Sequence, residues 1–582
     1  MNAERLLAHF ERISEAPDAI ARLRRFILDL AVRGKLVEQD PEDEPAAELL
    51  AAISSETQHA KGRRKVSPHS AGLVREGPFG VPSSWAWTQL GAIGDWGSGS
   101  TPSRGRSDYY GGAISWFKSG ELSDNKCLRE SEEKITHLAL EQCSFRLSNP
   151  GDVLIAMYGA TIGKLAILGE EAVTNQAVCA CTPYWGIDTE YLYLFLLAQR
   201  DEFRLASEGG AQPNISKVKI VNTPIPLPPL AEQHRIVAKV DELMALCDQL
   251  EAARQQREQG RERLMAATLQ RLNQPAEDPT SFRNDASFAL QVLPSLTTTP
   301  AQNKQLRQTI LNLAVRGKLV EQSPEDEPAI SWLLQRVEGN HSRRSRKTVA
   351  TSVEGCQDSS ISVLPETWLW VVLDDLVLVM DSGWSPQCED HPRSSIESWG
   401  VLKTTAVQSL FFDERYHKEL PSNLQPRPQH EAREGDILIT RAGPKNRVGI
   451  SCVIDKIEPR LMISDKIIRL RLADGLSPCF VALALNAGRS SEAVEDAKSG
   501  MAVMQMNISQ VKLRAVPIPL PPLAEQHRIV AKVDELIDLC DQLEQQLSQA
   551  DQQRRRLLEA LLAEALGGRL PTAQEESHAV IA

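Results

Sequence analysis

Glycines followed by a lysine, the residue types that can bind a nucleotide phosphate, occur from Gly159 to Lys164. In a phosphate-binding loop, backbone N–H groups surround the phosphate and a hydroxyl side chain after the lysine binds magnesium. In this chain Tyr158 stands where the first glycine is required, and Leu165 stands where the hydroxyl is required. The pattern therefore does not predict a nucleotide-binding loop.

Other catalytic signatures are missing as well. The sequence has no GxSxG or HExxH motif, and no GxGxxG motif at an expected strand–helix junction. Triplets such as Glu132-Glu133-Lys134 are too short to indicate a nuclease. The 11 histidines are scattered, and the closest of the 10 cysteines, Cys179 and Cys181, have no partners at zinc spacing, so buried reduced thiols are expected. The sequence thus predicts a binding protein.

An internal repeat indicates the framework that positions any binding residues. The stretch Pro224–Leu243 returns unchanged at Pro517–Leu536, and Leu30–Gln39 returns at Leu313–Gln322 with its letters LAVRGKLVEQ. Repeats of this length predict two copies of one structural unit. The prolines that open the first stretch remove backbone donors, so we expect an extended connector that cannot be a central strand.

A long helix is predicted after each connector. Apolar residues recur at alternating spacings of four and three, which is the seam of a coiled coil. In the first copy we expect the helix from Ala231 to about Asn273, roughly 64 Å at 1.5 Å per residue. The first seam comprises Ile236, Val240, Leu243, Cys247 and Leu250, and the second comprises Ile529, Val533, Leu536, Cys540, Leu543, Leu547, Ala550, Leu557 and Leu561.

Two globular domains are predicted before these helices. All tryptophans except Trp332 lie within 85–185 or 368–399, and the pairs Trp85/Trp87 and Trp368/Trp370 are expected to start the first strand of each domain. The runs that follow Gly151-Asp152 and Gly435-Asp436 are rich in β-branched residues and are predicted to be strands. Between such landmarks the two domains differ, which indicates one scaffold with two different surfaces.

Length and charge limit the possible functions. A chain of 582 residues is long enough for about four domains. No apolar run approaches the ~20 residues that a membrane span needs, and the N-terminus lacks a signal-peptide pattern, so we expect a cytoplasmic protein. The net charge of −12 has the wrong sign for binding nucleic acid by charge alone. Any contact with a polyanion must be local, or be shared with a basic partner.

Each copy also has a basic cluster in a polar stretch. The first contains Lys61, Arg63, Arg64 and Lys65, and the second contains Arg343, Arg344, Arg346 and Lys347. These stretches are interpreted either as solvated linkers or as arms that contact phosphates. The sequence leaves both alternatives open.

Taken together, the motifs resemble the specificity subunit of type I restriction-modification enzymes. The resemblance extends from about residue 20 to 570, and the order of its motifs occurs twice. It rests on Gly99-Ser-Thr-Pro-Ser103, Ile114-Ser-Trp116, Gly151–Lys164, Thr174-Asn-Gln-Ala177, and the Pro-Leu-Pro-Pro-Leu-Ala-Glu-Gln sequence before each long helix.

This resemblance implies an α+β fold with two mixed α/β globular target recognition domains, joined by two long antiparallel coiled-coil helices with an internal pseudo-twofold duplication. Each domain would read one half of a split, asymmetric site in double-stranded DNA, and the helices would set the spacing. The subunit would itself be non-catalytic and bind no cofactor. Two methyltransferase subunits would use S-adenosylmethionine, and restriction subunits would use ATP and magnesium.

Base edges are read by polar and basic side chains, so loops beside the Gly-Asp strand supply the candidate DNA contacts. In the first domain the candidates are Ser100, Thr101, Ser103, Arg104, Lys118, Tyr158, Thr161, Lys164, Asn175, Gln176, Gln212 and Asn214. In the second they are Trp384, Ser385, Lys403, Arg441, Lys445, Asn446, Arg447, Lys466, Gln505 and Asn507. The cations Arg441, Lys445 and Arg447 are the preferred candidates, whereas the Asn-Ile-Ser context of Asn214 and Asn507 is also typical of a turn.

Two other functions remain open: a single chain that both recognises and modifies DNA, and a coiled-coil adaptor that binds protein. The expected boundaries are 1–52 for a helical segment, 53–80 for a linker, 81–228 for the first recognition domain, 229–273 for the first long helix, 274–335 for a linker and repeated helical segment, 336–363 for a polar linker, 364–521 for the second recognition domain, 522–568 for the second long helix, and 569–582 for a tail.

Overall fold

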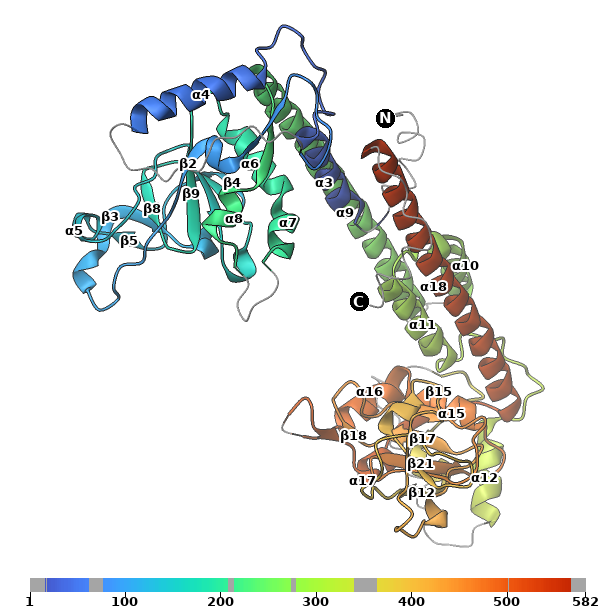
Figure 1. Cartoon of the computed structure of the whole chain (residues 1–582). Helices are drawn as coiled ribbons and strands as arrows, with labels where there is room; N and C mark the ends of the chain where they lie inside the picture. The colour runs from blue at the N-terminus through green and yellow to red at the C-terminus, as the bar shows by residue number, and fades with distance from the viewer. Residues whose placement is uncertain are drawn as a thin grey trace. The chain divides into compact units, whose positions relative to one another are not determined.

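The computed structural model describes residues 16, 18–61, 77–207, 214–273, 279–339, 364–500 and 502–566. The chain forms two compact units, of which the first comprises residues 1–256 and 551–582 and the second comprises 257–550. Each unit contains one globular domain, the beginning of one long helix and the end of the other (Figure 1). This composition is the one expected of two long helices that run antiparallel.

The globular part of the first unit, domain 1, has three sheets. A five-stranded sheet has the order β2-β9-β6-β7-β4, a three-stranded sheet has the order β5-β3-β8, and β1 pairs with β10. The strands are β1 Ala86–Gln89, β2 Gly94–Ser98, β3 Tyr110–Phe117, β4 Asn125–Leu128, β5 Lys134–Ile135, β6 Val153–Ala156, β7 Leu165–Leu168, β8 Ala172–Thr174, β9 Val178–Pro183 and β10 Pro224–Leu227. The helices are α3 Ala19–Val32, α4 Ala46–Lys61, α5 His137–Gln142, α6 Thr189–Ala198, α7 Arg200–Leu205, α8 Lys217–Val221 and α9 Leu230–Asn273.

The second unit repeats this plan in domain 2. In the described residues its sheets have the orders β12-β21-β17-β19 and β16-β13-β20, and three strand pairs form two-stranded sheets: β11 with β23, β14 with β15, and β18 with β22. The strands are β11 Leu369–Val372, β12 Val377–Ser382, β13 Gly400–Leu402, β14 Val407–Gln408, β15 Phe411–Phe412, β16 His417–Glu419, β17 Ile437–Thr440, β18 Ala442–Gly443, β19 Ser451–Val453, β20 Leu461–Met462, β21 Ile467–Leu472, β22 Met506–Asn507 and β23 Pro517–Leu520. The helices are α10 Pro279–Leu296, α11 Pro300–Ala314, α12 Ala329–Gly339, α14 Leu373–Leu376, α15 Pro478–Leu485, α16 Gly488–Ala497, α17 Gln510–Arg514 and α18 Leu523–Leu566.

The predicted Gly-Asp strands are confirmed, and each is an interior strand of the largest sheet of its domain. Every residue of β6 and of β17 is buried. In domain 1, one face of β6 joins a core with α6 and α3, and the other face packs into a second core with β4, β7 and β9. A strand covered on both faces reads as a continuous apolar run, as both sequences do.

The proline connectors are strands as well as spacers. Pro224–Leu227 forms β10, which pairs antiparallel with β1 in a ribbon of two strands, so its missing N–H groups leave no central ladder incomplete. Pro517–Leu520 pairs with β11 in the same register. The expected strand starts after Trp85 and Trp368 are confirmed, because β1 begins at Ala86 and β11 begins at Leu369.

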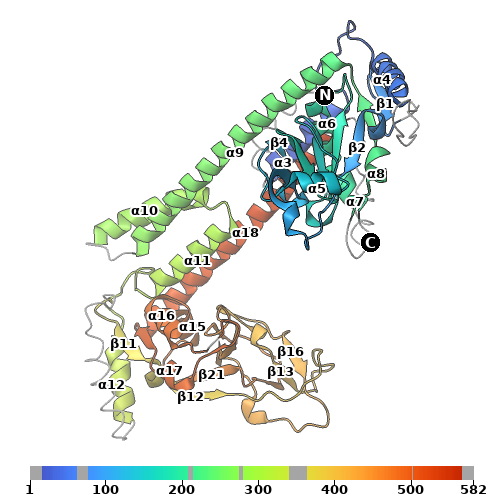
Figure 2. The ribbon, with the colours of Figure 1, turned by 90° about the vertical axis from the view of Figure 1, so that its left-hand side faces the viewer.

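Both long helices contain 44 described residues, and α9 is helical over the predicted range up to Asn273. In the first unit the start of the apolar seam, Ile236 and Val240, packs with α3 and the core of domain 1. In the second unit Ile529 and Val533 pack in the same way with α11 and the core of domain 2. Figure 2 shows α11 alongside α18 and α10 alongside α9. Each seam is therefore shared between the long helices and the shorter helices that precede each domain.

Residues of the two repeated sequence stretches contact one another at the start of each long helix. Trp85 Nε1 and Gln39 Nε2 donate hydrogen bonds of 2.9 and 2.6 Å to the buried Glu232 carboxylate. Arg235 forms a bidentate ion pair with Asp43. We call this set, with its second copy Trp368, Gln322, Glu525, Arg528 and Asp326, the domain–helix junction.

Two boundaries differ from the expected ones. Helix α4 continues to Lys61 and α12 continues to Gly339, so both run into segments expected to be linkers. Except for Lys61, the two basic clusters lie outside the described residues. The described helices include none that is long and apolar enough to cross a membrane.

Candidate DNA-reading surface

Four strand ends meet at one edge of domain 1. Strand β9 is antiparallel to both β2 and β6, and β3 is parallel to β8, so the ends of β2 and β6 lie beside the start of β9. The end of β8 is joined to the start of β9 by only three residues, 175–177. Backbone hydrogen bonds link these ends: Ser100 N donates to Thr174 O at 2.9 Å, and Asn175 N donates to Phe117 O at 2.9 Å. The predicted residues on these loops are therefore brought together.

A glycine is required at this edge because two backbones come very close. A Cβ placed on Gly99 would lie 1.9 Å from Thr174 O, and a Cβ on Gly383 would lie 1.7 Å from Ile463 O. Real Cβ atoms do not approach so closely, so a side chain at either position would push the loop after β2 or β12 away. The same close approach in both domains shows that the loops are built alike.

A side-chain hydrogen bond joins the loops in each domain. The Thr101 hydroxyl bonds to Gln176, and the Ser385 hydroxyl bonds to Asp465. These pairs occupy corresponding positions, because Thr101 and Ser385 each follow the close-packed glycine by two residues. Both domains have this contact, but the hydroxyl bonds to an amide side chain in domain 1 and to a carboxylate in domain 2.

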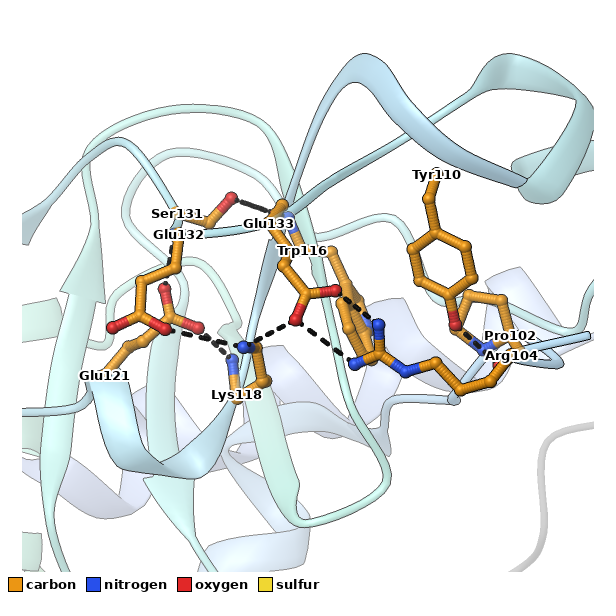
Figure 3. Close-up of polar contacts among 9 residues, drawn as sticks. All are labelled: Pro102, Arg104, Tyr110, Trp116, Lys118, Glu121, Ser131, Glu132 and Glu133. Atoms are coloured by element: carbon orange, nitrogen blue, oxygen red, sulfur yellow. Dashed lines mark hydrogen bonds and ion pairs between the residues drawn. The ribbon is translucent and has the colours of Figure 1, made fainter. Parts of the chain in front are cut away.

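Arg104 and Lys118 share one carboxylate in domain 1 (Figure 3). Arg104 donates from Nη1 and Nη2 to Glu133 at 2.7 and 3.1 Å, and Lys118 Nζ donates to Glu133 at 2.9 Å. These donors lower the pKa of Glu133 to about 2, because each of them stabilises the charged carboxylate. The two predicted cations thus lie side by side, and they are paired within the protein.

The predicted residues after β6 form a second group. Tyr158 is exposed and forms an isolated β-bridge with Asn214, while the Thr161 hydroxyl donates to Tyr158 O at 2.9 Å. Lys164 closes the turn through a backbone bond from its N–H to Thr161 O at 2.9 Å. The segment from Gly159 is a short 3₁₀ turn. Asn214 is also two residues before Ser216, whose side chain caps α8, so its context is a structural turn as well.

Two of the remaining domain 1 candidates, Asn175 and Ser100, form hydrogen bonds that involve the backbone. Asn175 Oδ1 accepts a hydrogen bond from Ala177 N at 3.1 Å, and Ser100 O accepts one from Trp116 Nε1 at 3.0 Å. Ser103 is exposed, and its backbone O accepts a 3.1 Å hydrogen bond from Arg106 N across the turn that contains Arg104. Gln212 lies outside the described residues.

In domain 2 a basic hollow of about 510 Å³ lies at the corresponding strand ends. Its lining includes the predicted residues Ser385, Lys403 and Lys466, together with Lys418 and one acidic residue, Asp390, which bonds to Lys418. Lys403 follows β13 as Lys118 follows β3, and each begins a 3₁₀ turn. Trp384 lies outside this lining, with the guanidinium of Arg427 4.2 Å above its ring. A hollow with several lysines has the charge that a DNA backbone requires.

Arg441 and Lys445 project from the loop after β17. Among the described residues, the side chain of Arg441 makes one weak hydrogen bond, 3.4 Å from Nη1 to Asp465 O, so most of its donors have no partner there. Lys445 forms an ion pair with Glu495 at 3.4 Å, and both Lys445 and Asn446 are exposed. Nearby, Asn507 pairs with Ser499 and with Ala442, while Gln505 is exposed in the loop between Ser499 and Asn507.

Arg447 differs from the other two cations of this loop. Its guanidinium donates to Gln408 Oε1 at 2.8 Å, to Thr404 O at 3.0 Å and to Val407 O at 2.8 Å. These contacts tie the loop after β17 to the 3₁₀ turn after β13. The Arg447 guanidinium is therefore bound within domain 2, and its contact with DNA stays a prediction from its charge.

Two residues of this surface were missed by the sequence-based list. Glu133 was set aside as part of an uninformative triplet, and Lys418 was not considered, yet they occupy corresponding positions. In domain 1, Trp116 on β3 donates its N–H to Glu133 O on one side and pairs with Val173 of β8 on the other. In domain 2, Val401 on β13 pairs in the same way with Lys418 of β16 and with Met462 of β20. No spacing in the sequence marks either residue, because the pairing of β5 with β3 and of β16 with β13 is visible only in the fold.

The described residues contain no group of three or more His, Cys, Asp or Glu side chains that could hold a metal ion. Cys179 and Cys181 are buried on β9, where burial raises the pKa of both thiols, that of Cys179 to about 12. Cys127, in contrast, is exposed.

Comparison with known proteins identifies close relatives. A family model described as the type I restriction modification DNA specificity domain matches residues 82–258 and 429–550. The chain is 37% identical to the type I restriction enzyme EcoEI specificity subunit of Escherichia coli, with 94% of each chain covered. It is 27% identical to the EcoAI specificity subunit of the same organism, again with 94% of each covered. A chain from a solved type I R-M system is 20% identical, with coverage of 84% and 99% and a TM-score of 0.47.

Proposed function

The chain belongs to the family of type I restriction-modification specificity subunits, and from this premise we propose how it selects DNA sequence. It is the non-catalytic, DNA-recognising subunit of such a system. Each globular domain reads one half of a split, asymmetric site through the loops at its converging strand ends. The long helices set the distance between the two half-sites.

One observation supports this proposal above the others. The two domains keep the same close-packed glycine and the same loop-to-loop hydrogen bond, but present different side chains around them. Domain 1 presents an arginine and a lysine held by Glu133, whereas domain 2 presents the lysine-rich hollow and Arg441. A common framework with different donors is what two different half-sites require.

Partner subunits complete the proposed assembly. Two methyltransferase subunits bring S-adenosylmethionine, and restriction subunits bring ATP and magnesium, in the cytoplasm where the host DNA is. Partners also explain the net charge of −12, because they contribute part of the positive surface that surrounds the DNA phosphates. The chain itself supplies the contacts that distinguish bases.

The test is to change one loop in each domain and to map the methylated DNA. The full-length chain is co-expressed with its methyltransferase subunit, and methylated adenines are mapped in a plasmid library of random sequence. We expect Arg104→Ala to relax one base of one half-site and Arg441→Ala to relax one base of the other. If both variants altered the same half-site, or if neither altered the site, the proposed division of labour would be wrong.

A further inference from the structure

Glu133 connects both predicted cations of the domain 1 surface. Its Oε2 accepts from Arg104 Nη1 at 2.7 Å, and its Oε1 accepts from Arg104 Nη2 at 3.1 Å and from Lys118 Nζ at 2.9 Å. The Arg104 side chain is 61% exposed, so without this carboxylate it would sample many rotamers. The carboxylate therefore fixes an arginine that would otherwise be mobile.

The geometry leaves the reading edge of Arg104 available. A guanidinium has five N–H donors in one plane, and a carboxylate that binds Nη1 and Nη2 uses two of them. The remaining donors, including that on Nε, do not point at Glu133. An arginine held in this way can still form the two hydrogen bonds that guanine O6 and N7 accept.

Two aromatic rings contact the same guanidinium (Figure 3). The central carbon of Arg104 lies 4.8 Å from the ring centre of Tyr110 and 5.5 Å from that of Trp116. The Tyr110 hydroxyl is itself fixed by a 2.8 Å hydrogen bond to Pro102 O. The rings add cation–π attraction to the two hydrogen bonds that Glu133 forms with the guanidinium.

Glu133 is in turn held by its neighbours. Trp116 N donates to Glu133 O at 3.2 Å and to Ser131 Oγ at 3.0 Å, and Ser131 Oγ donates to Glu133 O at 2.5 Å. Glu121 accepts from the backbone N–H groups of Lys118 and Glu132, each at 2.9 Å. The backbone that carries Glu133 is thus tied to the strand that carries Trp116.

Domain 2 has no carboxylate at this position. The residue opposite Val401 is Lys418, which bonds to Asp390 and lines the basic hollow. A carboxylate on a surface that faces DNA would repel phosphates unless it binds a cation. At this strand position domain 1 has a carboxylate that binds two cations and domain 2 has a lysine, and this difference fits two domains that read different half-sites.

We propose that Glu133 is a positioning residue that orients Arg104 toward one base of the half-site bound by domain 1. This inference rests on the proposed function, and it adds a specificity-determining residue whose own charge is unsuited to contact DNA. Glu133 acts through Arg104, and it keeps Lys118 beside the same base pair. Without Glu133, Arg104 retains its charge but loses its orientation.

The experiment compares Glu133→Ala, Glu133→Gln, Arg104→Ala and the double variant Glu133→Ala/Arg104→Ala in the full-length chain, co-expressed with its methyltransferase subunit. Methylated adenines are mapped in the random-sequence library, and thermal melting checks the fold. We expect Glu133→Ala to reduce discrimination about tenfold at the base position that Arg104→Ala affects. The double variant should resemble Arg104→Ala, and Glu133→Gln, which keeps one acceptor, should lie between wild type and Glu133→Ala.

The matched control is Glu132→Ala, because the Glu132 side chain is 75% exposed and is 3.4 Å from Lys118. This variant should keep the wild-type site. If Glu133→Ala increased methylation of all sequences by the same factor, Glu133 would only repel DNA, and the inference would be wrong. It would also be wrong if Glu133→Ala discriminated normally while Arg104→Ala did not. If Arg104→Ala itself kept full discrimination, the assignment of this loop to base reading would fail too.

Discussion

Trp85 Nε1 donates a hydrogen bond to the buried carboxylate of Glu232 at 2.9 Å, and the equivalent bond from Trp368 to Glu525 has the same length. The bond joins the first residues of each globular domain to the first turn of the long helix that follows it. Gln39 and Gln322 complete the two carboxylate sites. The repeated letters of the sequence are therefore explained by a repeated junction, which fixes each domain to its helix.

The junction should contribute measurably to stability. Glu232→Ala leaves the Trp85 and Gln39 donors without their acceptor, so we expect the free energy of unfolding to fall by about 1–3 kcal/mol. Chemical denaturation followed by tryptophan fluorescence measures the change. Glu42→Ala is the control, because Glu42 is exposed on the neighbouring loop and its removal should have little effect. Equal stability of the two variants would show that the junction does not hold the domain.

The same carboxylates should produce a pH dependence. Burial raises the pKa of Glu232 and of Glu525 above the ordinary 4.5. A raised pKa means that the folded chain binds the proton more tightly than the unfolded chain, so the stability from these groups is complete below about pH 4.5 and is lost as the pH rises through the raised pKa.

Replacing both residues with glutamine should remove that loss, because glutamine does not ionise. The melting temperature of Glu232→Gln/Glu525→Gln, relative to wild type, should therefore increase as the pH rises from 4.5 toward 7. Melting curves recorded at several pH values check this. A constant difference across the range would mean that the two carboxylates titrate normally in the folded chain.

Arg441 and Arg447 should behave differently although both lie in one loop. Arg441→Ala removes a largely free guanidinium, and we expect a loss of about 1–3 kcal/mol of discrimination at one base of the domain 2 half-site. Arg447→Ala removes three hydrogen bonds to the turn after β13, so we expect a lower melting temperature. Methylation mapping and thermal melting of both variants separate the two roles, and a reversed pattern would refute them.

The long helices should act as the ruler. Deleting seven residues from each helix keeps the apolar seam in register and shortens the helix by about 10.5 Å. That length corresponds to about three base pairs of DNA. We expect the gap between the two half-sites to shrink by about this amount, with both half-site sequences unchanged. An unchanged gap would mean that the helices do not determine the spacing.

The sequence predicted the parts of the fold that depend on local patterns. Alternating four and three spacings predicted the long helices α9 and α18, and the Gly-Asp runs marked β6 and β17. Both depend on residues close together in the chain. Because the two copies share identical sequence stretches, the same elements could be predicted in the second domain.

Side-chain roles were predictable only in part. Thr101 and Gln176 were both on the list of candidates, but their contact depends on strands that are far apart in the chain. Arg447 and Glu133 show the limit most clearly, since charge suggested a contact residue for the first and no role for the second. Only the pairing of the strand ends decides which charged side chains bind their own protein and which remain free.

The recognised DNA sequence itself tests the central claim most directly. Methylated adenines would be mapped by sequencing DNA from cells that express the full-length chain with its methyltransferase subunit. The duplicated framework with two different surfaces predicts a site of two unlike short words separated by a gap of fixed length. A single continuous word, or two identical words in inverted orientation, would contradict it.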